Sequence, residues 1–341
     1  MTNIQELRLK ALKNINFPID IIKTIVLDNF TEEINETSIN DFIKNIAEYD
    51  FYNNLDEVLF KLEEYAFKKV SIFMIKEKNL EEITNDTYKM NFISRNRIRY
   101  CENKENLNGI GEDFKCTYYR DSEQYFTMKV ALIKTVEIEN PENGYSSIEN
   151  YEYYDFVKFV VDKNEGLLFM FYNDISYLSP NEDVNNDRAV TNKKSSFYNL
   201  FIDGNKRTLT KYFIDEELNE YVIDILQEIK EEEGILKKVI PIIETEDPVD
   251  SKNNLRSSTR DARHNKYRLQ AIKYAIENED HNIKTIESLI NGRHILFRNK
   301  GEIILPIPYF GMEVIRDVCR EVFPKYRLSS TAKAATGTYN S

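Results

Sequence analysis

The stretch YDFVKFVVDKNEGLLFMFY (residues 154–172) decides the fold. It holds two runs rich in aromatic and β-branched residues, 154–161 and 167–172, joined by the polar loop 162–166 that ends in Gly166. Such runs around a short loop with a glycine predict a β-hairpin. Parts of both runs are apolar at consecutive positions, so both faces of the hairpin should be covered. We therefore expect it at the centre of a sheet.

The residues before this hairpin also follow the pattern of a strand. Between residues 126 and 139, Met128, Val130 and Leu132 fall on one face, and the other face is mostly polar. A β-rich region is therefore expected from about residue 90 to about residue 178.

The first 76 residues show helical periodicity instead. A capping-box pattern begins the first helix at Thr2, and Ser38 precedes another run of apolar residues at helical spacing. The clearest apolar stripe begins at Leu55 and predicts a helix that runs to Lys69 or beyond. Residues 70–75 fit either the end of that helix or the start of a strand, and periodicity does not distinguish the two.

The part of the chain after the sheet alternates polar segments with short periodic ones. The expected order is a loop (179–196), a helix (215–233), a strand (235–243), a polar segment (244–254), a helix (255–277), a short helix, a hairpin (293–298 and 302–307), a last helix from about 312, and a tail (328–341). The charge changes sign across the polar segment, so we expect a domain boundary near residue 250.

These patterns together predict an α+β protein. An N-terminal helical domain (1–89) should precede a β-rich α+β domain (90–250) built on a central aromatic-rich antiparallel sheet. A C-terminal α/β module (251–327) should carry a basic amphipathic helix, and a mobile tail (328–341) should follow it.

Composition sets limits on the class of protein. Hydrophobic residues make up 41% and charged residues 30% of the 341 residues, which is typical of a folded globular protein. The N-terminus lacks the apolar core of a secretion signal, and no window has the ~18 apolar residues of a membrane span. The scattered cysteines Cys101, Cys116 and Cys319 predict reduced thiols in a soluble, cytoplasmic protein.

Positive charge is concentrated near the C-terminus. Residues 251–341 contain 16 Lys and Arg against 9 Asp and Glu, a net charge of +7, whereas the whole chain has a formal net charge of −12. At ~100° per residue, one side of the expected helix collects five basic residues, Arg256, Arg260, Arg263, His264 and Arg268, and Lys266 is a further candidate contact outside this arc. This side could contact the phosphates of nucleic acid. Alternatively, it faces solvent or docks on the acidic helix expected at 215–233.

A second basic group consists of Arg95, Arg97 and Arg99. Their spacing of two would place them on one face if the segment is an extended strand, where they could bind the same anionic ligand. The alternative is that they neutralise the acidic residues around them.

Signatures of enzymes and metal sites are weak. The chain has no phosphate-binding G-x-x-x-x-G-K-[ST] loop, no G-x-S-x-G and no H-E-x-x-H, and its three histidines match no local metal-ligand spacing. We expect no cofactor and no metal. A carboxylate and lysine set on neighbouring strands, Glu137, Asp155 and Lys158, is of the type that metal-dependent nucleases use, although many other triplets would serve equally well.

Three hypotheses about function follow. The first is a non-enzymatic, nucleic-acid-associated binding protein, DNA-binding or otherwise, that contacts phosphates through the basic helix. The second is a structural subunit of a protein assembly, whose basic helix contacts an acidic face of a partner or of another copy. The third is a metal-dependent nuclease. None of them involves a membrane.

Overall fold

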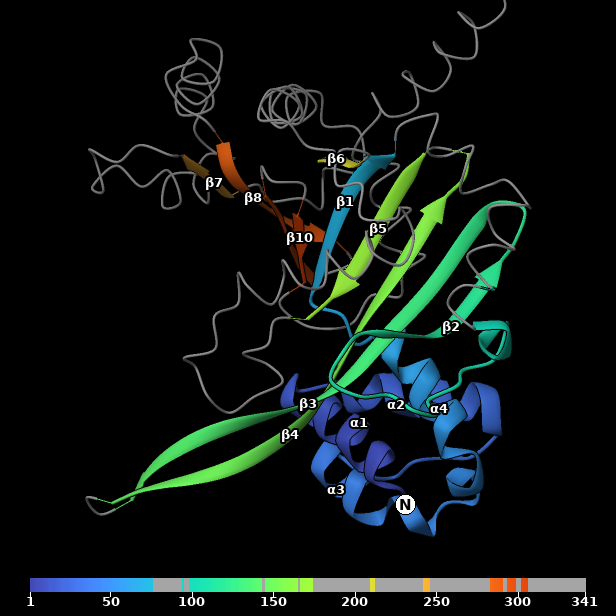
Figure 1. The fold of residues 1–341 in the computed structure, drawn as a ribbon, viewed down its shortest axis with the longest axis vertical. Coiled ribbons are helices and arrows are strands. Elements are labelled where there is room, and N and C mark those ends of the chain that lie inside the picture. The colour runs from blue at the N-terminus through green and yellow to red at the C-terminus, as the bar shows by residue number, and fades with distance from the viewer. Residues whose placement is uncertain are drawn as a thin grey trace, which may run out of the picture. The chain divides into compact units, whose positions relative to one another are not determined.

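A computed structural model describes residues 1–75, 94, 98–142, 145–164, 166–173, 209–211, 242–245, 283–290, 293–298 and 302–305. The chain divides into two compact units. The first consists of Met1–Thr210 with Ile307–Tyr309, and the second of Lys211–Pro306 with Phe310–Ser341. Figure 1 shows the helices and strands.

The N-terminal part of the first unit is helical, as predicted. Its helices are α1 (Asn3–Asn14), α2 (Ile19–Phe30), α3 (Ile39–Asn45), the 3-10 helices η1 (Ile46–Glu48) and η2 (Asp50–Asn54), and α4 (Leu55–Glu63). The predicted capping box of α1 is confirmed. The Thr2 hydroxyl accepts a hydrogen bond from the Gln5 backbone N–H, and the Gln5 side chain accepts one from the Thr2 N–H. Ser38 caps α3 in a similar way, with its hydroxyl accepting from the Asp41 N–H at 3.2 Å.

The helix that begins at Leu55 is shorter than the sequence predicts. It ends at Glu63, and strand β1 (Lys69–Ile75) follows after a short turn, so the expectation that it reaches Lys69 is wrong. The turn is held from outside by the buried amide of Asn173, which donates to the Ala66 carbonyl (2.8 Å) and accepts from the Lys68 N–H (2.9 Å). Helical periodicity carries no information about a partner that is more than 100 residues away.

The first unit contains a fully antiparallel sheet. Its strands are β2 (Lys115–Asp121), β3 (Tyr125–Glu142), β4 (Tyr145–Asp162), β5 (Leu167–Tyr172) and β1, in the spatial order β2-β3-β4-β5-β1. The predicted hairpin is confirmed, since β4 and β5 pair from Lys158↔Phe171 to Asp162↔Leu167 around a turn in which Gly166 has φ 66°. Each of its strands has a neighbour on both sides, so it is central in the sheet.

Both faces of this hairpin are covered. All six residues of β5 are buried. On one face, Phe159, Met170 and neighbouring side chains form an apolar cluster with the buried Cys101 and Cys116. On the other face, the rings of Phe156 and Phe171 contact Phe67, which follows α4. This double coverage explains the consecutive apolar residues in the sequence.

Strands β3 and β4 are longer than the sheet around them. They pair as far as Glu142↔Tyr145, whereas β2 pairs with β3 only up to Ala131 and β5 pairs with β4 only from Lys158. We call residues 136–151 of this hairpin the β3–β4 arm. Figure 1 shows it extending past the helices as a two-stranded ribbon.

The described part of the second unit is a small antiparallel sheet. Its strands are β7 (Ile242–Thr245), β8 (Ile283–Ile290), β9 (Arg293–Arg298) and β10 (Glu302–Ile304), in the order β10-β9-β8-β7. The predicted hairpin of β9 and β10 is confirmed. A further short strand, β6 (Leu209–Lys211), spans the division between the two units.

One expectation for the second unit is wrong. The short helix expected before the hairpin is replaced by strand β8, which pairs with β7 on one side and β9 on the other. Apolar residues at 283, 286 and 290 have helical spacing. Two flanking strands nevertheless satisfy the backbone of this segment in an extended form.

The prediction of an α+β protein with a large antiparallel sheet is confirmed. Several other expectations lie outside the described residues, namely the loop 179–196, the helices at 215–233, 255–277 and 312 onward, and the tail 328–341. The boundaries at residues 89, 250 and 327 stay predictions. Among the described residues, no helix is long and apolar enough to cross a lipid bilayer.

Candidate functional site

Most of the basic residues singled out in the sequence lie outside the described part of the chain. This holds for Arg95 and Arg97 and for the whole set between residues 256 and 268. Arg99 is described and belongs to a 3-10 helix, η3 (Ile98–Cys101). The segment is therefore not extended at Arg99, and the spacing argument for a strand does not apply there.

A different group of charged side chains is buried inside the first unit. Arg8 is fully buried, Lys129 and Glu63 are 2% and 3% exposed, and the Glu105 side chain is 9% exposed. We call these four residues the Arg8 cluster. Two cations and two carboxylates make it formally neutral, which is what a buried set of charges requires.

The geometry of the Arg8 cluster centres on the guanidinium. Arg8 donates to Glu63 through two nitrogens, Nε to Oε1 at 2.7 Å and Nη2 to Oε2 at 2.8 Å. The same Nη2 donates to Glu105 Oε2 at 2.8 Å, and Nη1 lies 3.5 Å from Asp56 Oδ1. Lys129 Nζ donates to both Glu63 and Glu105. Bidentate arginine pairs of this kind are among the stronger protein hydrogen bonds.

Four separate segments supply the members of the cluster. Arg8 comes from α1, Glu63 is the last residue of α4, and Lys129 lies on β3. Glu105 belongs to the loop between η3 and β2. The backbone of that loop is attached to β2, because Asn106 N–H donates to the Thr117 carbonyl at 2.8 Å. The cluster thus links the helices, the sheet and this loop.

Burial and the neighbouring charges shift the pKa values of Glu63 and Arg8 in opposite directions. Burial raises the pKa of Glu63, but the charges and hydrogen bonds of Arg8 and Lys129 outweigh it, and the pKa is lowered. For Arg8, burial lowers the pKa, whereas Glu63 and Glu105 raise it well above the ordinary value. Arg8 and Glu63 therefore both stay charged near neutral pH, so this pair is a poor acid-base catalyst.

Aromatic rings surround the two cations. Lys129 Nζ lies 5.2 Å from the ring centre of Phe60 and 5.3 Å from that of Phe156. The Arg8 guanidinium carbon is 5.9 Å from the ring centre of Tyr154. These are cation–π distances, and they add attraction in a desolvated site.

Another buried lysine lies beside the cluster. Lys158 on β4 forms an ion pair with Glu64, which follows α4, and its amine is 5.6 Å from the Phe60 ring centre. Burial lowers the pKa of Lys158, and Glu64 counteracts part of that effect. The ion pair therefore links Lys158 on the sheet to Glu64 at the end of α4.

The Glu137, Asp155 and Lys158 set is not brought together by the strands. Asp155 lies opposite Leu132 and Lys158 opposite Lys129, and side chains three residues apart on a strand point to opposite faces. Glu137 lies opposite Asn150, which is five residues, or about 17 Å, along β4 from Asp155. Within the described residues, no group of three or more His, Cys, Asp or Glu side chains could hold a metal ion.

A cavity of about 690 Å³ lies next to the Arg8 cluster. Its walls come from η2 and α4, from the loop that contains Glu105, and from Tyr118 on β2. The rings of Phe60 and Tyr118, 4.8 Å apart between centres, lie on one side. Five asparagines contribute neutral hydrogen-bonding groups: Asn53, Asn54, Asn103, Asn106 and Asn108. The cavity has room for a small polar ligand.

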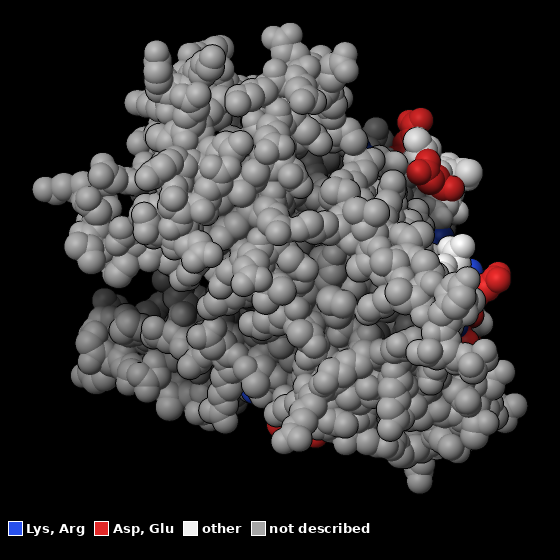
Figure 2. Space-filling model, turned by 90° about the horizontal axis from the view of Figure 1, so that it is seen from above, with Lys and Arg blue, Asp and Glu red and all other residues white. Residues whose placement is uncertain are grey.

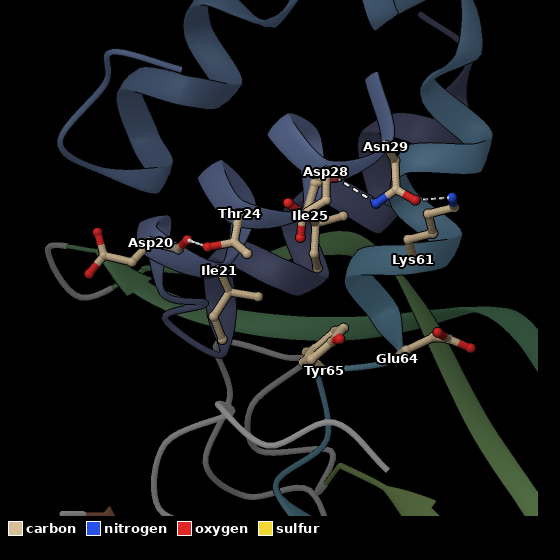
Figure 3. A pocket seen from close by; sticks show the side chains of 9 residues that line it. All are labelled: Asp20, Ile21, Thr24, Ile25, Asp28, Asn29, Lys61, Glu64 and Tyr65. Atoms are coloured by element: carbon tan, nitrogen blue, oxygen red, sulfur yellow. Dashed lines mark hydrogen bonds between the residues drawn. The ribbon is translucent and has the colours of Figure 1, made fainter. Parts of the chain in front are cut away.

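A smaller cavity of about 510 Å³ lies between α2 and α4 (Figure 3). Lys61 donates to the Asn29 side chain, whose amide in turn donates to the Ile25 carbonyl at 2.7 Å. The Thr24 hydroxyl is likewise used, because it donates to the Asp20 carbonyl at 2.9 Å. These polar side chains are hydrogen-bonded within or between the two helices, which leaves fewer groups directed at a ligand.

The two described cysteines are buried free thiols. Burial raises the pKa of both Cys101 and Cys116, so neither forms the thiolate required of a nucleophile near neutral pH. For these two the prediction of reduced thiols agrees with the structure. Cys319 lies outside the described residues.

Sequence reasoning missed the Arg8 cluster, although a signal was present. Arg8 is the only arginine in the first 94 residues, and it lies between Ile4 and Leu12 in the apolar stripe of its helix. Lys158 is the one charge in the stretch 156–161, where every other residue is Phe or Val. A lone charge at an apolar position predicts a buried ion pair, because its desolvation must be compensated.

The comparisons with known proteins add no functional assignment, since no protein-family model matches the chain and no curated protein matches its sequence. The surface offers one general observation. Acidic side chains are exposed among the described residues in the view of Figure 2. This agrees with the composition, because residues 1–250 contain 49 Asp and Glu against 30 Lys and Arg.

Proposed function

We propose that this protein is a non-enzymatic binding protein that contacts nucleic-acid phosphates through its basic segment, residues 255–268. The proposal rests on the uneven distribution of positive and negative charge along the chain. This segment contains five Lys and Arg and one Asp, on a chain whose first 250 residues are strongly acidic. A local excess of cations on an acidic protein is typical of a polyanion-binding surface.

The buried ion pairs support this choice of segment indirectly. Arg8, Lys129 and Lys158 are each committed to carboxylates inside the first unit. They are consequently not available at the surface to hold an extended polyanion. Arginine in the basic segment is also well suited to phosphate, because its planar fork binds two oxygens at once.

The test is a charge reversal in the segment. The triple variant Arg256→Glu, Arg260→Glu and Arg263→Glu should abolish the binding of single- or double-stranded oligonucleotides at low salt, measured by fluorescence anisotropy. The logarithm of the wild-type binding constant should fall linearly with the logarithm of salt concentration. Unchanged affinity of the triple variant would disprove the proposal.

A matched control keeps the same change in net charge at a different place. Lys13, Lys44 and Lys104 are exposed residues of the first unit. Their replacement by Glu also changes the net charge by six, and it should leave most of the binding intact. Equal loss in both variants would mean that net charge, and not the basic segment, governs the interaction.

The second candidate function is a subunit of a protein assembly, and the β3–β4 arm favours it. A two-stranded hairpin alone is marginally stable in water, so an arm beyond its sheet gains stability from a partner. Among the described strands, none pairs with the outer edges of the arm, and open edges are sites of strand addition.

Shortening the arm tests this candidate without changing the sheet. Val136 and Tyr151 lie directly opposite each other. Replacing residues 137–150 by Asn-Gly should therefore close the hairpin with a two-residue turn. Light scattering should show a wild-type oligomer and a smaller species for the shortened variant. A monomeric wild type at low and at high salt would exclude self-assembly through the arm.

A further inference from the structure

Glu105 separates the two cations of the Arg8 cluster from the neighbouring cavity. Glu105 lines the cavity of about 690 Å³, whereas Arg8, Lys129 and Glu63 do not. It is also the most exposed of the four side chains. Its carboxylate thus faces the cations on one side and borders an open space on the other.

The two carboxylates of the cluster have different roles. Glu63 is held in the core at the end of α4 and binds the Nε and Nη2 edge of Arg8 at 2.7 and 2.8 Å. Glu105 occupies the remaining position, where one of its oxygens accepts from Arg8 Nη2 at 2.8 Å and the other accepts from Lys129. An arginine and a lysine that each donate to one oxygen of the same carboxylate form a carboxylate-binding site.

The charge balance requires an anion at the Glu105 position. Without the Glu105 carboxylate, Glu63 would be the only buried carboxylate in the cluster, because Asp56 is 63% exposed and its Oδ1 lies 3.5 Å from Arg8 Nη1. One positive charge would then be poorly compensated in a desolvated place. Breaking a buried pair in this way is strongly unfavourable. A singly charged oxyanion restores neutrality, whatever its source.

Rotation of the Glu105 side chain is sufficient to vacate the position. The loop backbone is fixed on both sides of it, because Asn103 N–H donates to the Tyr119 carbonyl (2.9 Å) and Asn106 N–H to the Thr117 carbonyl (2.8 Å). The side chain itself has three rotatable bonds and an adjacent cavity to turn into. No movement of the fold is needed.

The cavity walls indicate the kind of anion. The charged residues that line the cavity beside Glu105 are two carboxylates, Asp56 and Glu57, and two cations, Lys61 and Lys104, so the walls add no net positive charge that would favour a phosphate dianion over a monoanion. Phe60 and Tyr118 offer aromatic faces for a planar or apolar body, and the asparagines offer hydrogen bonds. A monocarboxylate on a small, partly aromatic body fits this combination.

We propose that Arg8 and Lys129 form a binding site for a small-molecule carboxylate, which Glu105 occupies as an internal ligand until the external carboxylate enters from the cavity and replaces it. This site is separate from the basic segment, and the proposal does not depend on nucleic-acid binding. Because the internal carboxylate competes at a high effective concentration, its removal exposes the site to simple carboxylates.

The experiment measures the thermal stability of the full chain and its Glu105→Ala variant at constant ionic strength, in chloride, acetate, benzoate or phosphate. In chloride, Glu105→Ala should melt below the wild type. At a carboxylate concentration of about 100 times Kd, its Tm should rise by about 5 to 10 °C. Benzoate should act at lower concentration than acetate, and the wild type should respond much less.

The double variant Glu105→Ala with Lys129→Met provides the control, because its cluster is neutral without an added anion. It should show no saturable response to carboxylate. An equal response of the wild type and Glu105→Ala, or an equal response of the double variant, would overturn the proposal. A larger Tm rise with phosphate than with acetate at equal concentration would overturn the assignment to carboxylates.

A refolding measurement tests the site if Glu105→Ala does not fold in chloride. In that case the measurement is the yield of refolded protein in acetate compared with chloride, for Glu105→Ala and for the nearly isosteric Glu105→Gln. Recovery that depends on acetate supports the site. Equal yields in the two salts for both variants would disprove it.

Discussion

Arg8 illustrates how the environment of a side chain changes its role. An exposed arginine on a helix contributes little to stability, whereas Arg8 is fully buried and binds two carboxylates from different segments. Ion pairs of this kind are costly to desolvate and costly to break. We therefore expect the Arg8 cluster to favour the arrangement of α1, α4 and β3 in which all four charges are paired.

Removing one charge from this cluster should destabilise the protein strongly. Glu63→Gln keeps the size of the side chain but leaves Arg8 and Lys129 with too little negative charge. We expect a loss of about 3–5 kcal/mol in the free energy of unfolding, because a buried charge loses its partner. Urea denaturation followed by circular dichroism measures this loss.

Glu57→Gln on the same helix is the matched control. Glu57 is 60% exposed and pairs with Lys61 at 3.5 Å, one helical turn away. An exposed pair of this spacing is worth about 0.3–0.5 kcal/mol. Similar losses of unfolding free energy in Glu57→Gln and Glu63→Gln would show that a charge in the Arg8 cluster contributes no more to stability than an exposed one.

At the scale of single elements, local chemistry accounts for the hairpin and the helix starts. The turn after β4 requires the positive φ of Gly166, and the caps at Thr2 and Ser38 satisfy backbone groups within three residues. The end of α4 and the strand β8 depend on partners far along the chain. For this reason periodicity predicted the first group correctly and the second incorrectly.

The hairpin turn makes a prediction at this scale. Gly166→Ala forces an alanine into the left-handed region at φ 66°, which costs roughly 1–2 kcal/mol. Stability measured by urea denaturation should fall by about that amount, while the β-sheet signal in circular dichroism is retained.

Gly111→Ala serves as the control for this substitution. A Cβ at Gly111 would meet no atom within 4 Å, and its φ is not positive. The change should be neutral or slightly stabilising, because it mainly restricts the unfolded chain. If both alanine variants lose the same stability, the backbone conformation of Gly166 is not the cause.

At the scale of the whole molecule, charge is distributed unevenly along the sequence and between the interior and the surface. Cations of the first unit are partly buried in ion pairs, whereas the segment 255–268 carries a local excess of positive charge. The same distribution makes stability depend on pH, because the buried carboxylate must stay ionised for the cluster to remain neutral.

Stability should decrease in acid through Glu63. Its pKa is the ordinary 4.5 in the unfolded chain and lower in the folded protein, so the unfolded state takes up the proton first. The contribution is complete above about pH 5.5 and is lost as pH falls through 4.5 towards the folded pKa. Thermal melting between pH 3 and 7 should show this decrease. The slope in acid should be smaller in Glu63→Gln, and an identical slope would contradict the assignment.

The hairpin at 154–172, the helix caps and the α+β class follow from the amino-acid order, because each depends on neighbours within a few residues or on a simple apolar period. The contrast between the acidic residues 1–250 and the basic segment 255–268 likewise follows from the sequence alone. The Arg8 cluster is different, because Arg8, Glu63, Glu105 and Lys129 are separated by 24 to 97 residues in its contacts and meet only when helices, sheet and loop pack together. Long-range packing decides which charges are buried, and therefore where a ligand could find two cations behind a single carboxylate.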